Sequence, residues 1–163
     1  MNRPSTNDVG LIDDLQARYI HALDSKNFRA WADTFSSAPD AAYFCISAEN
    51  VERDLPIALM YDDCRDRIED RIVFIEKIWV DTFQDYRTRH FIQRTHCDAL
   101  ASGIYVVETN FSILYTPETG RSDVQVVGVY KDEVVIEADG ARFKSRRAIY
   151  DTVVLPRYIV YPF

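Results

Sequence analysis

The second half of the chain constrains the fold more than any other feature, because long β-rich segments alternate there with short turns. Four segments are rich in Val, Ile, Tyr, Phe and Thr, and they cover residues 87–97, 105–115, 122–136 and 142–155. The separators have turn chemistry, and Asp139-Gly140 is a strong signal for a tight hairpin. Consecutive strands joined by short turns pair antiparallel. We therefore predict an antiparallel meander of four long strands.

The first half has helical periodicity instead. Apolar residues recur at helical spacing from residue 7 or 8 to about residue 24–26, and residues 28–35 favour a short second helix. Residues 64–80 form a third candidate helix, with one apolar stripe made of Ile68, Ile72, Ile75 and Trp79. Residues 41–47 have strand composition, and residues 50–56 are a polar excursion. The predicted order is helix, helix, strand, helix and then the meander.

This order of elements predicts an α+β fold in which one curved antiparallel sheet carries the N-terminal helices on its concave face. Such a cone is typical of the NTF2-like or cystatin-like group, and its interior can hold a ligand pocket. The 163 residues fit one domain over 1–163, with residues 1–6 expected to be disordered. Residues 156–163 are too apolar for a free tail, so we expect them to dock on a surface.

Composition excludes several classes of function. The net charge is −7 and the sequence pI is near 4.9, which disfavours nonspecific binding to nucleic acid. No apolar run is long enough for a membrane span, and the N-terminus lacks the apolar region of a secretory signal. The three cysteines do not have the spacing of a disulfide framework or a zinc site. These features together predict a cytoplasmic protein with no membrane and no nucleic-acid partner.

The basic residues are unevenly divided, with 15 Arg and only 4 Lys. Arg is preferred over Lys for bidentate or partly desolvated pairing, including pairing at subunit interfaces. Two Arg-containing clusters lie on predicted strands, at 87–94 and at 144–147. We interpret them as an interface rim rather than as anion sites.

Histidine offers little support for a metal site. His90 and His96 are six residues apart on a predicted strand, so their even spacing places both on one face. At about 3.3 Å per residue they are roughly 20 Å apart. A single metal ion needs all its ligand atoms within about 2.3 Å, so we expect no metal on this chain.

Acid–base chemistry inside the cone is the alternative. Asp33 at the end of the second helix, Tyr43 in the first strand and His90 in a later strand are pocket candidates, as in cone-shaped isomerases and dehydratases. The structural interpretation of the same residues is also open. Asp33 then caps a helix or pairs with an Arg, Tyr43 packs with its hydroxyl at the surface, and His90 bonds the backbone or a carboxylate.

Three segments resemble the small (β) subunits of bacterial aromatic-ring-hydroxylating dioxygenases. Residues 56–71 read PIALMYDDCRDRIEDR, and the helix within them resembles the family's Leu/Ile-x-Asp-Arg-Val/Ile signature. The entry helix is similar to the family's Tyr…Leu-Asp…Trp…Phe pattern, at Tyr19, Leu23, Asp24, Trp31 and Phe35. Arg89-His90-Phe91-Ile92 is similar to the family's Arg-His-hydrophobic run. The sequence departs from the family at residues 93–95, where an Asn is often found.

The resemblance implies a non-catalytic β subunit without catalytic residues or cofactors of its own. A large α subunit would carry a Rieske [2Fe–2S] cluster and a mononuclear Fe(II), in an α3β3 hexamer that also has β–β contacts. The reaction would be NADH- and O2-dependent hydroxylation of an aromatic acid of the benzoate, anthranilate or salicylate type. Interface residues are then expected at Asp70, Arg71, Arg89, His90, Tyr158, Tyr161 and Phe163. A stand-alone isomerase or dehydratase, or a ligand-binding protein, is the alternative.

Overall fold

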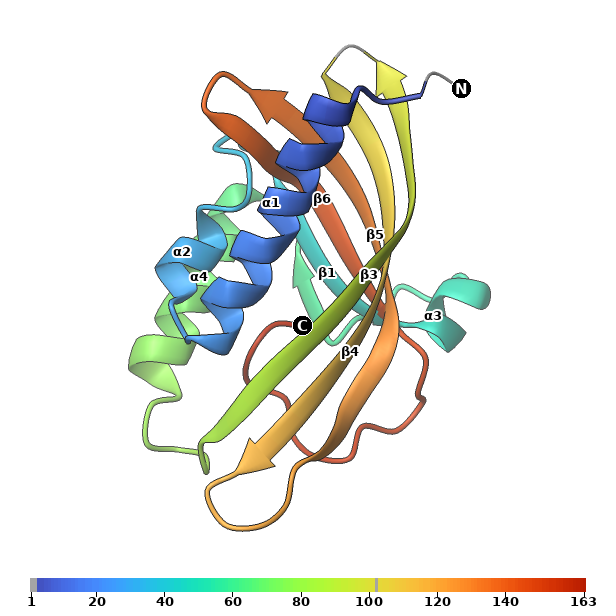
Figure 1. Ribbon diagram of the computed structural model, residues 1–163. Coiled ribbons are helices and arrows are strands. Elements are labelled where there is room, and N and C mark those ends of the chain that lie inside the picture. The colour runs from blue at the N-terminus through green and yellow to red at the C-terminus, as the bar shows by residue number, and fades with distance from the viewer. Residues whose placement is uncertain (1–2, 102) are drawn as a thin grey trace.

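A computed structural model describes residues 3–101 and 103–163, and its centre is one six-stranded sheet (Figure 1). The strand order is β2-β1-β6-β5-β4-β3. The strands are β1 (Ala42–Ser47), β2 (Met60–Asp62), β3 (Tyr86–Ala101), β4 (Ile104–Pro117), β5 (Asp123–Glu137) and β6 (Gly140–Tyr150). Strands β3 to β6 form the predicted antiparallel meander. Strand β1 pairs in parallel with β6, an arrangement that the sequence order did not indicate.

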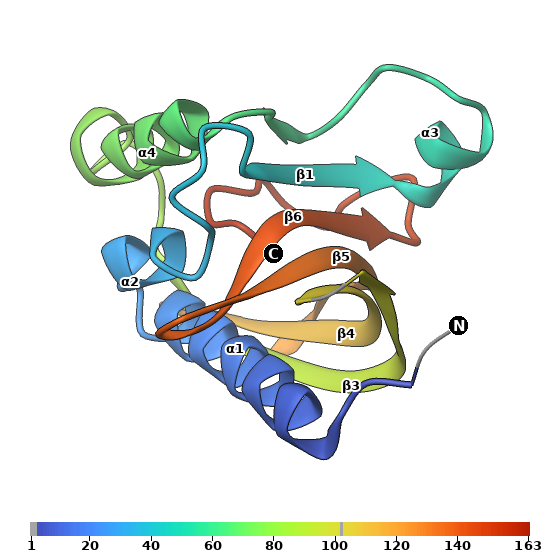
Figure 2. The same ribbon diagram turned by 90° about the horizontal axis from the view of Figure 1, so that it is seen from above.

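The helices are α1 (Thr6–Asp24), α2 (Phe28–Ala32), α3 (Ala48–Glu52) and α4 (Arg65–Val73), and α4 continues into a π-helical turn at Phe74–Ile78. The N-terminal helix α1 lies across the concave face of this sheet, as predicted, with α2 and α4 beside it, while α3 stands apart at the end of β1 (Figure 2). Helix α3 overlaps the start of the segment 50–56, which we predicted only as a polar excursion. The apolar stripe of α4 is correctly predicted, since Ile68, Ile72 and Ile75 are buried.

Helix α1 begins one or two residues earlier than its apolar pattern indicates. The side chain of Ser5 caps it by accepting a hydrogen bond of 3.1 Å from the backbone N–H of Asp8. The prediction of disorder over residues 1–6 is therefore wrong for Ser5 and Thr6, while residues 1–2 lie outside the described residues.

β-Bulges bend the long strands and change which side chains face inward. In the β3–β4 pairing the register shifts between Arg94 and His96. The shift reverses the alternation, so His90 is buried inside the cone while the side chain of His96 is 49% exposed. The prediction that His90 and His96 share one face is therefore wrong. Strand spacing alone cannot reveal a bulge.

The last strand ends earlier than predicted, at Tyr150 rather than near residue 155. Beyond Tyr150 the chain leaves the sheet, and Val153 and Val154 lie in an exposed loop. Residues 156–163 then return to the cone, where Val160, Tyr161 and Phe163 are buried (Figure 1). Their apolar character is explained by docking on this chain itself.

A single hydrophobic core fills the space between helices and sheet. Its centre is aromatic, with edge-to-face contacts that join Tyr19, Trp31, Phe35 and Tyr43 at centroid distances of 5.4 to 6.2 Å. Within the described ranges, no helix has the length and hydrophobicity that crossing a membrane requires.

Candidate functional site

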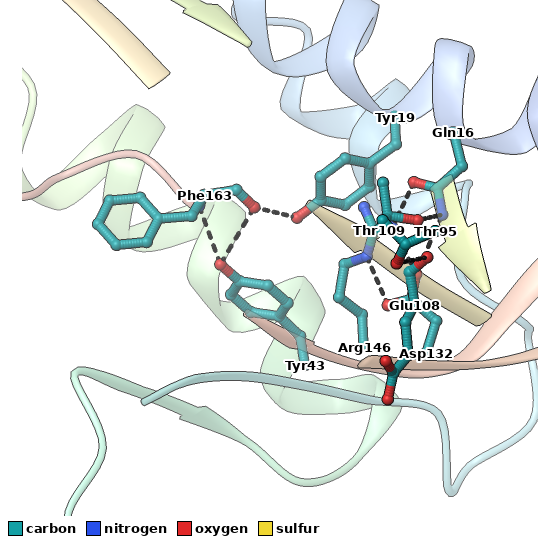
Figure 3. A network of polar contacts seen from close by, with 9 residues as sticks. All are labelled: Gln16, Tyr19, Tyr43, Thr95, Glu108, Thr109, Asp132, Arg146 and Phe163. Atoms are coloured by element: carbon teal, nitrogen blue, oxygen red, sulfur yellow. Dashed lines mark hydrogen bonds and ion pairs between the residues drawn. The ribbon is translucent and has the colours of Figure 1, made fainter. Parts of the chain in front are cut away.

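A buried charged network lies where the concave face of the sheet meets α1 (Figure 3). Arg146 of β6 is 0% exposed, and its guanidinium donates to both carboxylate oxygens of Asp132 of β5, at 2.9 and 2.7 Å. Gln16 of α1 accepts from Arg146 at 2.5 Å and donates to Asp132 at 3.1 Å. It also donates to Thr109 of β4 at 3.3 Å, so the network ties α1 to three strands.

Aromatic rings enclose this guanidinium. Its central carbon lies 4.1, 4.0 and 3.9 Å from the ring centroids of Tyr19, Tyr130 and Phe143. Burial by itself would lower the pKa of Arg146, but the attraction of Asp132 outweighs it, so the pKa lies above its ordinary value. Arg146 is therefore a permanent cation with a fixed partner, and the prediction that places it in an interface rim is wrong.

The C-terminal segment closes the interior of the cone. The backbone N–H of Phe163 donates to the hydroxyl of Tyr43 at 2.9 Å, and its main-chain oxygen accepts from the hydroxyl of Tyr19 (Figure 3). Burial raises the pKa of Tyr19 to about 12 and raises the pKa of Tyr43 well above its ordinary value. Both hydroxyls therefore keep their protons at neutral pH.

Asp24 and His90 form a second pair, which joins the end of α1 to β3, with the side chain of His90 buried and that of Asp24 partly buried. His90 Nδ1 lies 2.6 Å from Asp24 Oδ1, and the backbone N–H of His90 donates to Asp24 Oδ2 at 3.0 Å. The hydroxyl of Thr88 donates to the same carboxylate at 2.9 Å. Burial raises the pKa of Asp24, but the hydrogen bonds and the charge of His90 outweigh it, so the net shift is downward.

The three acid–base candidates do not form a site. Asp33 follows α2 as its C-cap, and its side chain is exposed to solvent. The hydroxyl of Tyr43 is engaged with Phe163 in the core, so the expectation that it lies at the surface is also wrong. His90 is engaged with Asp24, as the structural interpretation predicted. Among the described residues no hydrogen bond joins these three side chains.

The predicted interface residues separate into two groups. Asp70, Arg89 and Tyr158 are exposed, and Tyr158 keeps 49% of its surface accessible. The side chains of the other four are largely buried within their own chain: Arg71, His90, Tyr161 and Phe163.

Arg71 does not pair with its neighbour Asp70. It reaches Asp62 in β2 at 2.5 and 2.7 Å, and the Asp62 side chain is only 5% exposed. The rings of Tyr161 and Phe163 lie inside the core, so their assignment as interface anchors is corrected.

Sequence reasoning missed Gln16 and Asp132 of the network. Gln16 gave a usable signal, because it lies on the same helical face as Ile12, Leu15 and Tyr19. Asp132 gave none, since its opposite strand neighbour Arg146 is fixed by a hairpin register that includes a bulge between Glu133 and Val134.

Candidate metal ligands do not cluster in the part of the chain that the structure describes. It contains no group of three or more His, Cys, Asp or Glu residues that could hold a metal ion. All three cysteines are free thiols, with Cys45 buried and Cys64 and Cys97 partly buried.

The curved sheet, the helices across its concave face and the conical interior define an α+β cone of the NTF2-like class. The sequence profile of the family described as "Ring hydroxylating beta subunit" matches residues 18–157. The chain therefore belongs to the family of β subunits of aromatic-ring-hydroxylating dioxygenases, which are the non-catalytic part of the terminal oxygenase.

Relatives agree with this assignment. The small subunit of anthranilate 1,2-dioxygenase from Burkholderia cepacia is 30% identical over 138 residues, which cover 85% of this chain and 83% of that protein. A solved β subunit assigned to an aromatic-ring-hydroxylating dioxygenase of Novosphingobium aromaticivorans is also 30% identical. It has a TM-score of 0.79, with 89% and 90% of the two chains covered. The β subunit of benzoate 1,2-dioxygenase from Burkholderia mallei shares the fold, with a TM-score of 0.72, 22% identity and 93% coverage of each chain.

Proposed function

We propose that this chain assembles with a large α subunit into an α3β3 terminal oxygenase that hydroxylates an aromatic acid. The observation that carries the proposal is the filled cone. The chain's own tail and a neutralised Arg–Asp pair occupy the space in which a cone-shaped enzyme would hold its substrate. The subunit then contributes by supporting a partner that performs the chemistry.

The names of the relatives support the substrate class that we propose. Those described above are named for anthranilate and benzoate, two aromatic carboxylates. We extend that class to the complex in which this chain takes part. Electrons would come from NADH through separate carriers, and O2 would be the oxidant.

The cofactors belong on the partner. A Rieske cluster requires two Cys and two His in close pairs, and a mononuclear iron site requires a cluster of His and carboxylate ligands. The described residues of this chain do not fit either requirement, because His90 is engaged with Asp24 and Cys45 is enclosed in the core. We therefore assign the [2Fe–2S] cluster and the Fe(II) to the α subunit.

Contacts with other subunits are proposed at the predicted residues that remain accessible, Asp70, Arg89 and Tyr158. These residues lie on α4, on β3 and in the tail, so they can serve α–β and β–β contacts at different faces. A cytoplasmic location is supported by the three free thiols.

Co-expression with the gene of a candidate α subunit tests the proposal. Light scattering after size exclusion should give the mass of three copies of each subunit, with iron and aromatic-acid hydroxylation present only in the complex. The chain purified alone should contain no iron and have no hydroxylase activity. A chain that stays monomeric beside its partner, or an α subunit that is fully active alone, would refute this function.

The isomerase alternative has its own control. The proposed function predicts that the purified wild-type chain has no isomerase or dehydratase activity. His90→Ala and Asp33→Asn should therefore have no such activity to remove. Dehydration or isomerisation by the purified wild-type chain, abolished by either substitution, would replace the proposed function.

A further inference from the structure

No helix covers the convex face of the sheet where β3, β4 and β5 lie side by side. Among the described residues, α1 is the only helix that packs against these strands, and it lies on their concave side, where Asp24 meets His90 (Figure 2). Side chains that alternate with His90 along β3 therefore point away from the core. Large apolar side chains remain exposed on this convex side: Phe91 at 58%, Val124 at 49% and Val127 at 43%. Exposed apolar side chains that lie together indicate a surface for a protein partner.

The strand register groups two of these side chains around a hollow. Phe91 lies opposite Ser112 of β4, and Ser112 lies opposite Val127 of β5. Opposite residues of an antiparallel pair share one face of the sheet. The small Ser112 between two larger side chains leaves a shallow hollow of about 270 Å³, which Phe91 borders together with Gln93 and Asn110. Such a hollow can accept an apolar side chain of a partner protein, as the pockets at the centres of interfaces do.

The positions beside the hollow carry two arginines that have no acidic partner. Arg89 precedes Phe91 on the same face of β3, and Arg87 precedes Arg89. Both are exposed, and no carboxylate among the described residues forms an ion pair with either. The arginines that do pair with carboxylates of the chain are Arg18, Arg29, Arg53, Arg65, Arg67, Arg71, Arg94, Arg142 and Arg146. Arg87 and Arg89 are therefore available to a partner.

Charge indicates which partner fits this face. The chain as a whole has a net charge of −7, yet the residues opposite the two arginines, Thr116 and Leu114, are uncharged. A second copy that presented the same face would bring the arginines of both copies together, and like charges across an interface are unfavourable. A surface that carries carboxylates beside an apolar side chain fits better, because Arg binds carboxylates through two parallel hydrogen bonds.

We propose that the convex patch formed by Arg87, Arg89, Phe91, Ser112 and Val127 is the docking surface for the α subunit. An apolar side chain of that subunit fills the hollow beside Phe91, and its carboxylates pair with the two arginines. This surface rests on the proposed function, because it requires an α partner. It adds the face of the chain and the chemistry by which that partner is recognised.

Titration of purified variants against a tagged candidate α subunit tests the apolar part of the patch. Phe91→Thr removes the ring but keeps a residue that favours strands, and it should weaken binding about tenfold, as loss of an aromatic anchor does. Ser112→Trp fills the hollow and should weaken binding by a similar factor. Ile57→Thr is the matched control, because Ile57 is 61% exposed and precedes β2 at the other edge of the sheet. It should bind as the wild type does.

The same titration at several salt concentrations tests the two arginines. Binding of the wild-type chain should weaken as NaCl is added, because salt screens exposed ion pairs. The double variant Arg87→Gln, Arg89→Gln should bind severalfold more weakly at low salt and should depend less on salt. Arg53→Gln is the control, because Arg53 is exposed on α3, which packs against β1 and β6. It should keep both the affinity and the salt dependence of the wild type.

Failure of the docking surface and failure of the proposed function give different results. If the wild-type chain does not bind the α subunit at any salt concentration, both are refuted. If it binds, and Phe91→Thr and Ser112→Trp bind equally well, only the docking surface is overturned. The same holds if Phe91→Thr dissociates an oligomer of the isolated chain but leaves α binding unchanged, because the patch then serves a second copy. If Phe91→Thr lowers the melting temperature, Ser112→Trp and the double arginine variant decide.

Discussion

Arg146 and Arg147 are neighbours in β6, yet they lie in opposite environments. Arg146 points into the cone and is bonded to Asp132 and Gln16, while Arg147 is exposed on the outer face. Both belong to the excess of Arg over Lys that the composition shows. The structure shows that part of this excess stabilises the chain itself. Arg146 and Arg71 form its most buried ion pairs, and Arg65, Arg94 and Arg142 are also paired with carboxylates of their own chain.

Replacing Arg146 with Met should destabilise the fold strongly. Removing one partner of a buried ion pair leaves an uncompensated charge, here Asp132, and costs about 3–5 kcal/mol. Arg147→Met is the matched control and should change the free energy of unfolding by less than about 0.5 kcal/mol. Urea unfolding of the two variants measures both values. Similar losses for the two variants would contradict a buried role for Arg146.

Asp24 should make stability depend on pH. Its pKa in the folded state lies below the ordinary value of 3.8, because hydrogen bonds from His90 and Thr88 outweigh burial. Its contribution is therefore present at neutral pH and is lost as the pH falls through the folded-state pKa. The stability difference between wild type and Asp24→Asn should shrink steadily below about pH 4.

Urea unfolding at several pH values checks this sign. Asp33→Asn is a suitable control, because Asp33 is exposed at the end of α2. A difference between wild type and Asp24→Asn that stays constant down to pH 3 would show that the carboxylate charge contributes nothing.

At the scale of elements, two glycines differ in the space around them: Gly128 is tightly enclosed, whereas Gly10 is open. A Cβ on Gly128 in β5 would lie 2.1 Å from the carbonyl oxygen of Ile149 and 2.9 Å from the Phe111 ring. A Cβ on Gly10 in α1 would meet nothing within 4 Å. Gly128 is therefore required for the close approach of β5 to its neighbours, whereas Gly10 only weakens a helix.

Alanine substitutions at these glycines should change stability in opposite directions. Gly128→Ala should cost several kcal/mol, roughly 2–4, because backbone and ring must move. Gly10→Ala should add about 0.5–1 kcal/mol, the usual gain in an exposed helix interior. Thermal unfolding of both variants measures these changes in stability. A Gly128→Ala variant as stable as the wild type would show that β5 can move away from its neighbours at no cost in stability.

The elements could be predicted because their signals are local. The stripe of α4, the entry helix and the four-strand meander depend on periodicity and turn residues within short windows. Contacts between residues far apart in the sequence gave no such local signal. The parallel pairing of β1 with β6, the pairing of Arg71 with Asp62 and the docking of Phe163 join segments that only the completed fold brings together.

The same limit applies to the candidate site. Residue types identified Tyr43 and His90 as candidates for a pocket inside the cone, but not the particular residues that they bond. Tyr43 is bonded to the tail and His90 to the end of α1, while Asp33 is exposed to solvent. The three acid–base candidates therefore do not come together as a site.

For the whole molecule, the proposed function depends on surfaces that remain free after the interior is filled. Arg89 on the long edge strand β3 and Asp70 on α4 are exposed and are proposed as subunit contacts. Arg89→Glu and Asp70→Lys should weaken assembly with the α subunit severalfold, since reversed charges repel at a matched interface. Light scattering of the co-purified complex measures this loss.

The isolated chain provides the necessary comparison. Because both side chains point to solvent, the two charge reversals should leave its melting temperature within about 2 °C of wild type. If the complex keeps its mass and stability, these residues do not lie in the interface. If the isolated variant chain has a lower melting temperature, the weaker assembly is explained by a folding defect.

The parallel pairing of β1 with β6 has a consequence for how the protein matures. Tyr43 in β1 meets Phe163, a partner 120 residues later, and Ala42 meets Ser145. During synthesis the first strand leaves the ribosome long before either partner exists, and contacts of such high sequence separation form slowly. Folding is therefore completed only after translation of the tail, and until then the aromatic interior lacks the cover that the tail provides.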